Sequence, residues 1–286
     1  MSDTAKSTGN TPDRYAVMGN PVAHSLSPRI HARFAQQTGQ HLDYEAILVE
    51  PDGFPTAVEA FQRAGGKGLN VTVPFKEDAW RLADARSPRA ERAGAVNTLV
   101  LRADGSRYGD NTDGVGLVRD LLDNQGASVR ARRVLLLGAG GAARGVLEPL
   151  LEQRPARLVI ANRTPDKAKT LAAAFRDLGP VEGGGFPELE GHAFDLVINA
   201  TAAGLAGQVP PVPPGVVTLA TWCYDMMYGK GETDFVRWAR RQGTAHAVDG
   251  LGMLVEQAAE SFLLWRGVRP DTAPVIKTLR AELRKN

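Results

Sequence analysis

Cysteine is nearly absent from this chain, since Cys223 is the only one among 286 residues. A single thiol excludes a disulfide within the chain, and no spacing of cysteine and histidine typical of a metal site is present. We therefore predict that the protein binds no metal and works in a reducing, cytoplasmic compartment.

Long apolar runs are absent as well. No run approaches the roughly 18 residues that a membrane-spanning helix needs, so we expect no membrane partner. The first dozen residues, MSDTAKSTGNTP, are polar and lack the apolar stretch of a signal peptide. We expect these residues to form a flexible N-terminal tail.

Neither sign of charge is in much excess, because the formal net charge is only +2. This balance argues against a nucleic-acid partner. Hydrophobic residues make up 43% of the chain and charged residues 23%, which is typical of a globular protein with a core and excludes a disordered or fibrous one. The length favours two domains, and the sequence leaves open whether the protein is a monomer or a homodimer.

Strand-like and helix-like segments alternate along the chain, a pattern typical of α/β domains with mostly parallel sheets. Strands are expected at residues 15–18, 42–49, 69–73 and 95–101, and then at 132–137, 158–161, 194–200, 216–219 and 244–248. Helices are expected at residues 28–39 and 54–64. A second unit begins near Asp113, so that two crossings of the chain would join the two domains and leave a cleft between them.

The last long helix is expected at residues 252–265. Its apolar residues recur at helical spacing and should form one stripe. They are Leu251, Leu254, Val255, Ala258, Phe262 and Trp265. Although this helix follows the second unit, we expect it to pack back on the first.

A glycine-rich motif follows the apolar strand VLLL and precedes a predicted helix. The motif, GAGGAA, consists of Gly138, Ala139, Gly140, Gly141, Ala142 and Ala143. In a dinucleotide site, Gly138 would permit the tight turn, Gly140 would let the pyrophosphate approach the backbone, and Ala143 would allow close packing. The helix N-terminus would then bind the phosphates. The alternative is a merely tight turn, but the position between a strand and a helix favours a dinucleotide.

The end of the next strand indicates which dinucleotide. NAD sites place an acidic residue there, whereas this chain has Asn162, Arg163 and Thr164, followed by Lys167. An arginine can bind a 2′-phosphate through charge-assisted hydrogen bonds that a carboxylate would oppose. The alternative is that the arginine and lysine are simply solvated at a helix start, but positive charges are mildly unfavourable near the N-terminus of a helix. We therefore predict NADP.

Three polar segments lie where strands of the first unit should end. In HSLSP, Ser27 could simply cap a helix that begins at Pro28, but this leaves Ser25 unexplained. In NVTVPFK, alternation places Asn70 and Thr72 on one face of a strand.

The NVTVPFK segment ends at Lys76, which could be a solvated residue at a helix start. The third group of polar residues has two members. Asn97 lies inside an apolar strand, and Asp113 lies in DNTDG, where it could be a plain helix cap.

These segments together resemble one family. HSLSP, NVTVPFK, GAVNT, DNTDG, GAGGAA, NRT, INAT, YDMMY and DGLGMLVEQAA occur in an order and spacing similar to the shikimate dehydrogenases, from about residue 15 to residue 275. The resemblance implies an N-terminal α/β substrate-binding domain, residues 1–112 and 248–286. It also implies a Rossmann-type NADP-binding domain, residues 113–247, with a cleft between the two.

The resemblance further implies an activity and a set of site residues. The activity is the reversible reduction of 3-dehydroshikimate to shikimate with NADPH, a step of aromatic amino acid biosynthesis, with Lys76 and Asp113 as the catalytic pair. The residues expected around shikimate are Ser25, Ser27, Thr72, Lys76, Asn97, Asp113, Tyr228 and Gln257. Met226 and Gly250 match positions near the nicotinamide. Lys167 stands where the family commonly has arginine.

The chemistry suits these residues. Oxidation of a secondary alcohol needs a base for the hydroxyl proton and an acceptor for the hydride. Lys76 is the candidate base, and acid in the reverse direction, with Asp113 bonded to it and to the same hydroxyl. Whether Lys76 transfers the proton or mainly stabilises negative charge on the oxygen stays open.

Two alternatives remain. A quinate/shikimate dehydrogenase with broader substrate or cofactor use would have the same motifs, although Arg163 argues against a preference for NAD. A non-catalytic NADP-binding regulatory protein would be expected to have lost Lys76 or Asp113, and both are present.

Overall fold

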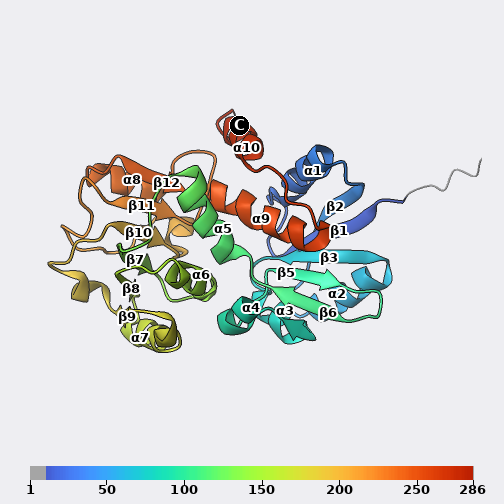
Figure 1. The fold of residues 1–286 in the computed structure, drawn as a ribbon, viewed down its shortest axis with the longest axis horizontal. Coiled ribbons are helices and arrows are strands. Elements are labelled where there is room, and N and C mark those ends of the chain that lie inside the picture. Colours follow the sequence, from blue (N-terminus) through green and yellow to red (C-terminus); the bar gives the residue numbers. More distant parts are fainter. Residues whose placement is uncertain (1–10, 286) are drawn as a thin grey trace, which may run out of the picture.

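The computed structural model of the protein describes residues 11–285. The predicted tail therefore lies almost entirely outside the described residues. Within them, the strands form two six-stranded sheets with helices packed around each (Figure 1). The fold is thus α/β, with a Rossmann-type second half, as the sequence predicted. Across residues 11–285, no helix has both the length and the apolar content that crossing a bilayer requires.

The first sheet has the order β2-β1-β3-β5-β6-β4. Its strands are β1 (Asp13–Gly19), β2 (Leu42–Leu48), β3 (Gly66–Val71), β4 (Ala85–Arg86), β5 (Thr98–Leu101) and β6 (Arg107–Asp110). Its helices are α1 (Ser27–Thr38), α2 (Phe54–Arg63), α3 (Lys76–Leu82) and α4 (Pro88–Ala93). The sheet is mixed, because β5 runs antiparallel to both β3 and β6.

The second sheet is wholly parallel and has the order β12-β11-β10-β7-β8-β9. Its strands are β7 (Arg133–Leu137), β8 (Arg157–Ala161), β9 (Val181–Gly184), β10 (Leu196–Asn199), β11 (Trp222–Asp225) and β12 (His246–Asp249). The helices around it are α6 (Gly141–Glu152), α7 (Pro165–Ala173) and α8 (Asp234–Arg241). The strand order reverses between β7 and β10, and such a switch point is where doubly wound sheets bind dinucleotides.

Two helices run between the sheets in Figure 1, α5 (Asp113–Arg119) and α9 (Leu251–Arg266). They approach closely because glycines lie at the contact, both between the helices and against the turn that follows α5. A Cβ on Gly116 would lie 2.7 Å from the backbone nitrogen of Gln257, and one on Gly252 would collide with the carboxylate of Asp120. After Arg119 the chain continues in a π-helical turn, Asp120–Asn124.

As predicted, α9 packs back on the first part of the chain. It contacts α1, β3 and β5, and its apolar residues share a buried cluster with Ile30 and Phe34 of α1. The helix is not the one-sided stripe that we predicted, however. Gly252, Met253 and Ala259 are buried too, because α5 covers one side of α9 and α1 the other. The last helix, α10 (Ala273–Leu283), packs on α9.

One predicted strand is wrong. Residues 216–219 form a turn region instead of a strand, in which Thr218 N donates to Thr221 Oγ1 at 2.9 Å. Val216 and Val217 are buried, but Leu219 is 75% exposed, so the apolar run marks a packed loop. The strand at this place in the sheet is β11, Trp222–Asp225, which begins six residues after the predicted start.

Candidate active site

Lys76 and Asp113 meet in space although 37 positions separate them. Lys76 begins α3 and Asp113 begins α5, and Lys76 Nζ donates to Asp113 Oδ2 at 2.6 Å. The side chains are 26% and 12% exposed, so the pair is sheltered but open to a ligand. Asp113 is not a plain cap, since the cap position of α5 is Thr112, and Lys76 is not simply solvated, since its ammonium group binds Asp113.

Asn97 connects this pair to α9. Its Nδ2 donates to Asp113 Oδ1 at 2.8 Å and to Gln257 Oε1 at 3.3 Å, while its Oδ1 accepts from the backbone N–H of Thr112 at 2.9 Å. Asn97 is 3% exposed and Gln257 9%. Four predicted residues, Lys76, Asn97, Asp113 and Gln257, thus belong to one connected network.

Three residues, of which Asn70 and Ser261 are buried and Tyr44 half-buried, extend the network and were not predicted as site residues. Asn70 Nδ2 donates to Ser261 Oγ at 3.0 Å, and Asn70 Oδ1 accepts from Tyr44 Oη at 2.7 Å. Burial raises the pKa of Tyr44 well above its usual value, so its hydroxyl stays a donor. The strand alternation pointed to Asn70, but no local signal in the sequence marks Tyr44 or Ser261.

The predicted serines lie at the loop after β1. Ser25 Oγ accepts from Ser27 N at 3.2 Å, and Ser27 is the first residue of α1 instead of its cap, which is Leu26. Ser27 is buried and Ser25 is half-buried.

Thr72 follows β3 in the same sheet, and its backbone N–H donates to Met18 O at 3.0 Å. Its methyl group lies against Gly19, where a Cβ would collide with it. Ser25, Ser27 and Thr72 are therefore at the carboxyl ends of two neighbouring parallel strands.

Tyr228 comes to this region from the second sheet. It packs against the cluster that contains Leu26 and Leu251, and burial raises the pKa of its hydroxyl. No hydrogen bond among the described residues joins Tyr228 to the network of Lys76. Apolar packing against the cluster of Leu26, the residue between Ser25 and Ser27 in the sequence, therefore holds Tyr228 in place.

The glycine-rich turn lies at the switch point of the second sheet. Gly138 has φ +106°, a conformation that favours glycine, and its N–H donates to Ala161 O at 2.8 Å. Gly140 and Gly141 open α6 with free space where a Cβ would be. Ala139 is half-buried and Ala142 exposed. The free amides of this helix start can therefore be approached by a phosphate.

The turn is close to Lys76 and Asp113 because α5 packs on α6. A Cβ on Gly114 would lie 2.6 Å from the carbonyl oxygen of Gly145. The residue after Asp113 thus touches the helix that the glycine-rich turn begins.

The segment after β8 is polar and lacks an acid at its first positions. Asn162 Nδ2 donates to Thr164 O at 3.0 Å and shapes the turn. Arg163, Thr164 and Lys167 are exposed. This donor set fits a 2′-phosphate, and the glycine-rich turn fits the pyrophosphate of the same molecule.

Met226 and Gly250 follow β11 and β12 and touch each other. A Cβ on Gly250 would collide with the carbonyl oxygen of Met226, and Gly250 N donates to Met227 O at 2.9 Å. The parallel strands place both residues at the same edge of the sheet as Gly138.

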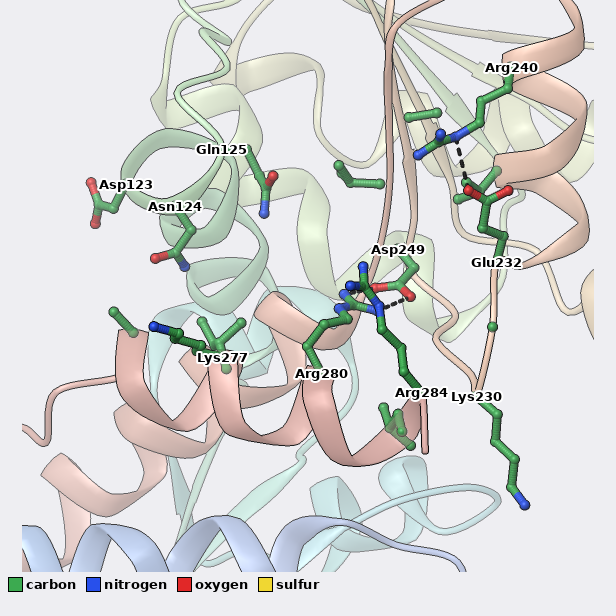
Figure 2. A pocket seen from close by; sticks show the side chains of 17 residues that line it. Asp123, Asn124, Gln125, Lys230, Glu232, Arg240, Asp249, Lys277, Arg280 and Arg284 are labelled. Atoms are coloured by element: carbon green, nitrogen blue, oxygen red, sulfur yellow. Dashed lines mark hydrogen bonds and ion pairs between the residues drawn. The ribbon is translucent and has the colours of Figure 1, made fainter. Parts of the chain in front are cut away.

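A groove of about 670 Å³ lies in another part of the molecule, between α10, the π-helical turn and β12. Figure 2 shows the side chains that line it. Arg280 of α10 binds Asp249 at the end of β12, with Nη1 to Oδ2 at 2.6 Å. Among the described residues that line the groove, none is a predicted site residue. The groove is therefore separate from the network around Lys76.

Comparison with known families agrees with this geometry. The model of the shikimate dehydrogenase substrate binding domain matches residues 17–99. The model of shikimate / quinate 5-dehydrogenase matches residues 120–206, and the shikimate 5′-dehydrogenase C-terminal domain matches residues 250–280.

Individual proteins are similar over nearly their whole length. A shikimate dehydrogenase (NADP(+)) of Methylococcus capsulatus is 61% identical over 273 residues, which cover 96% of this chain and 98% of that protein. The crystal structure of an Ael1 enzyme from Pseudomonas putida is 50% identical, with a TM-score of 0.89 over 93% of this chain and 98% of that one. Thermus thermophilus shikimate 5-dehydrogenase, in complex with NADP(H) and shikimate, is 35% identical, with a TM-score of 0.83 over 94% and 99% of the two chains. The chain therefore belongs to the shikimate dehydrogenase family.

Proposed function

We propose that the protein reduces 3-dehydroshikimate reversibly to shikimate with NADPH, and that Lys76 and Asp113 act at the reacting oxygen. The observation that carries this assignment is the 2.6 Å contact between Lys76 Nζ and Asp113 Oδ2 inside a network of polar side chains. The enzyme class and the cofactor agree with relatives at about 60% identity that are shikimate dehydrogenases (NADP(+)).

The network suits a cyclic polyol. Asn97, Asp113 and Gln257 already satisfy one another, so they are held in place before the substrate arrives. Four further residues carry hydroxyl groups, which can both donate and accept hydrogen bonds: Ser25, Ser27, Thr72 and Tyr228. We assign them to the remaining hydroxyls and the carboxylate of shikimate.

Lys76 handles the proton of the reacting hydroxyl. In reduction its ammonium group donates to the carbonyl oxygen as negative charge develops there, and in oxidation it takes the proton back. Asp113 Oδ2 holds the ammonium group, while Asn97 fixes the other carboxylate oxygen. The bound cofactor supplies or accepts the hydride.

The cofactor residues divide into three groups by position. The glycine-rich turn, Gly138, Ala139, Gly140, Gly141 and Ala142, would bind the pyrophosphate. The segment after β8, Asn162, Arg163, Thr164 and Lys167, would bind the 2′-phosphate. We place Met226 and Gly250 at the nicotinamide, because they lie at the strand ends on the other side of the switch point.

Three coarser features complete the proposal. Residues 1–112 and 248–286 form the substrate-binding domain, and residues 113–247 form the NADP-binding domain. The cleft lies between them. The protein acts in the cytoplasm, as its single cysteine favours, and is a monomer or a homodimer.

The test is NADP⁺ reduction followed at 340 nm with shikimate as the substrate. The proposal expects turnover with shikimate and NADP⁺, and lower kcat/KM with NAD⁺. Quinate is the second arm, because one matching family model covers shikimate and quinate dehydrogenases. Absence of turnover with both alcohols would overturn the proposal.

A further inference from the structure

Two motifs in the second sheet contain buried polar residues to which the catalytic scheme gives no role. They are INAT, residues 198–201, and YDMMY, residues 224–228. Asn199 is the last residue of β10 and Asp225 the last of β11, and the two are directly paired across the sheet. Their exposed fractions are 1% and 0%. Burying a carboxylate and an amide at these positions costs free energy unless their bonds are made.

The two side chains make those bonds with each other and with the loops that follow. Asn199 Nδ2 donates to Asp225 Oδ1 at 3.0 Å. The same oxygen accepts from Met227 N at 3.1 Å, and Asp225 Oδ2 accepts from Thr233 Oγ1 at 2.6 Å. Asp225 thus binds both ends of the loop that begins at Met226.

Asn199 reaches the opposite loop. Its Oδ1 accepts from the backbone N–H of Thr201 at 3.1 Å and from Thr201 Oγ1 at 2.7 Å. Thr201 in turn lies against the glycine-rich turn, since a Cβ on Gly138 would lie 3.1 Å from Thr201 Cγ2. The pair therefore connects the turn assigned to the pyrophosphate with the segment assigned to the nicotinamide.

Asp225 is poorly suited to touch a ligand itself. Its two oxygens are fully buried and occupied by three donors from the protein. Asp225 instead holds the backbone N–H of Met227 and the side chain of Thr233 in place. Supporting bonds of this kind fix the position of the groups that do touch ligands.

We propose that Asn199 and Asp225 form a positioning pair that fixes segment 226–228 against the glycine-rich turn. The pair thereby sets the distance between the nicotinamide end of the cofactor and the substrate hydroxyls near Tyr228. This inference rests on the proposed function, because that function places Met226 and Tyr228 in the site.

The test compares Asp225→Ala with Asp225→Asn. The asparagine can still accept from Asn199 Nδ2 and Met227 N, and its amide can donate to the Thr233 hydroxyl, so it should keep kcat/KM for shikimate within threefold of the parent. Alanine removes all three bonds and should raise KM for shikimate at least tenfold and lower kcat. Asp123→Ala, at an exposed acid, is the control for loss of one charge.

A second measurement does not depend on activity. Methyl carbon-13 labelling of methionine reports the environment of Met226 and Met227 separately from that of Met18 in the first sheet. Asp225→Ala should shift or broaden the first two resonances and leave Met18 unchanged. If the parent enzyme fails to oxidise shikimate while the methionine signals move as expected, the proposed function has failed and the positioning role has not.

Three results would overturn the inference. One is a folded Asp225→Ala enzyme with unchanged KM, kcat and methionine signals. Another is an Asp225→Asn enzyme as impaired as Asp225→Ala, since the charge itself would then matter. If Asp225→Ala does not fold, Asn199→Ser takes its place, and a KM for shikimate within threefold of the parent would decide against the pair.

Discussion

Lys76 Nζ lies 2.6 Å from Asp113 Oδ2, and this contact joins the first residue of α3 to the first residue of α5. The helix α5 is one of the two that run between the sheets (Figure 1), and it packs on α6, the helix that follows the glycine-rich turn. The hydrogen bond to Asp113 therefore connects Lys76 to the helix that packs beside this turn. The proposed reaction depends on this pair.

Replacing Lys76 with alanine should lower kcat at least about a hundredfold, because general acid–base catalysis contributes factors of this order. KM for NADP⁺ should change little, since the cofactor segments are elsewhere. Steady-state kinetics at 340 nm measure both. Lys67→Ala, at an exposed lysine of β3, is the matched control. A loss of less than threefold in the Lys76 variant would refute the catalytic role.

Arg163→Ala should raise KM for NADP⁺ much more than KM for NAD⁺. The guanidinium is exposed at the end of β8, where it can bind a 2′-phosphate that NAD⁺ does not carry. Parallel titrations with the two cofactors measure the ratio. Arg130→Ala, at an exposed arginine before β7, should leave the ratio unchanged. Equal effects on the two cofactors would rule out selection by Arg163.

His31 predicts a specific loss of stability in acid. The ring is fully buried in α1, stacks on Tyr44 with centroids 4.2 Å apart, and its nitrogens have no hydrogen-bond partner among the described residues. Burial lowers the pKa of His31 from 6.5 to about 3. Below pH 6.5 the unfolded chain binds a proton that the folded one refuses, so stability falls as the pH falls towards 3.

His31→Phe should remove this effect and keep the ring packing. Relative to pH 8, the histidine contributes a loss of about 2 kcal/mol in the free energy of unfolding at pH 5, from 1.36 kcal/mol per pH unit. Urea unfolding at both pH values measures the difference. The phenylalanine variant should show a pH dependence smaller by that amount, whereas His192→Phe, at an exposed histidine, should not. Identical pH profiles for His31→Phe and the parent would contradict the argument.

The sequence predicted the parts of the site that short motifs carry. Gly138 is in a conformation that favours glycine, Lys76 and Asp113 belong to segments with several polar residues, and Asn97 stands out as a polar residue inside an apolar strand. Partners from distant segments could not be predicted in this way. Ser261 binds Asn70 across 191 positions, inside a helix whose pattern indicates only an apolar core.

The wrong strand has a similar cause. Residues 216–219 form a local apolar run, but Val216 and Val217 pack on the sheet from a loop. The strand β11 contains Cys223 and Tyr224, which are buried on both faces and give no alternation to read. Packing against elements that are distant in the sequence decided which segment became the strand. A short stretch of sequence does not contain that information.

The crossing of α5 and α9 predicts whether the substitution Gly116→Ala stabilises or destabilises the protein. Helix propensity alone expects Gly116→Ala to stabilise the protein by up to about 1 kcal/mol. The structure expects the opposite, because the new Cβ would lie 2.7 Å from the backbone nitrogen of Gln257 and overpacking costs about 1–3 kcal/mol. Gly141→Ala, at the open start of α6, is the control that should not lose stability. Urea unfolding decides the sign, and KM for shikimate should rise in the Gly116 variant because Asp113 and Gln257 belong to the two helices forced apart. A more stable Gly116→Ala protein would show that the helices can separate without cost.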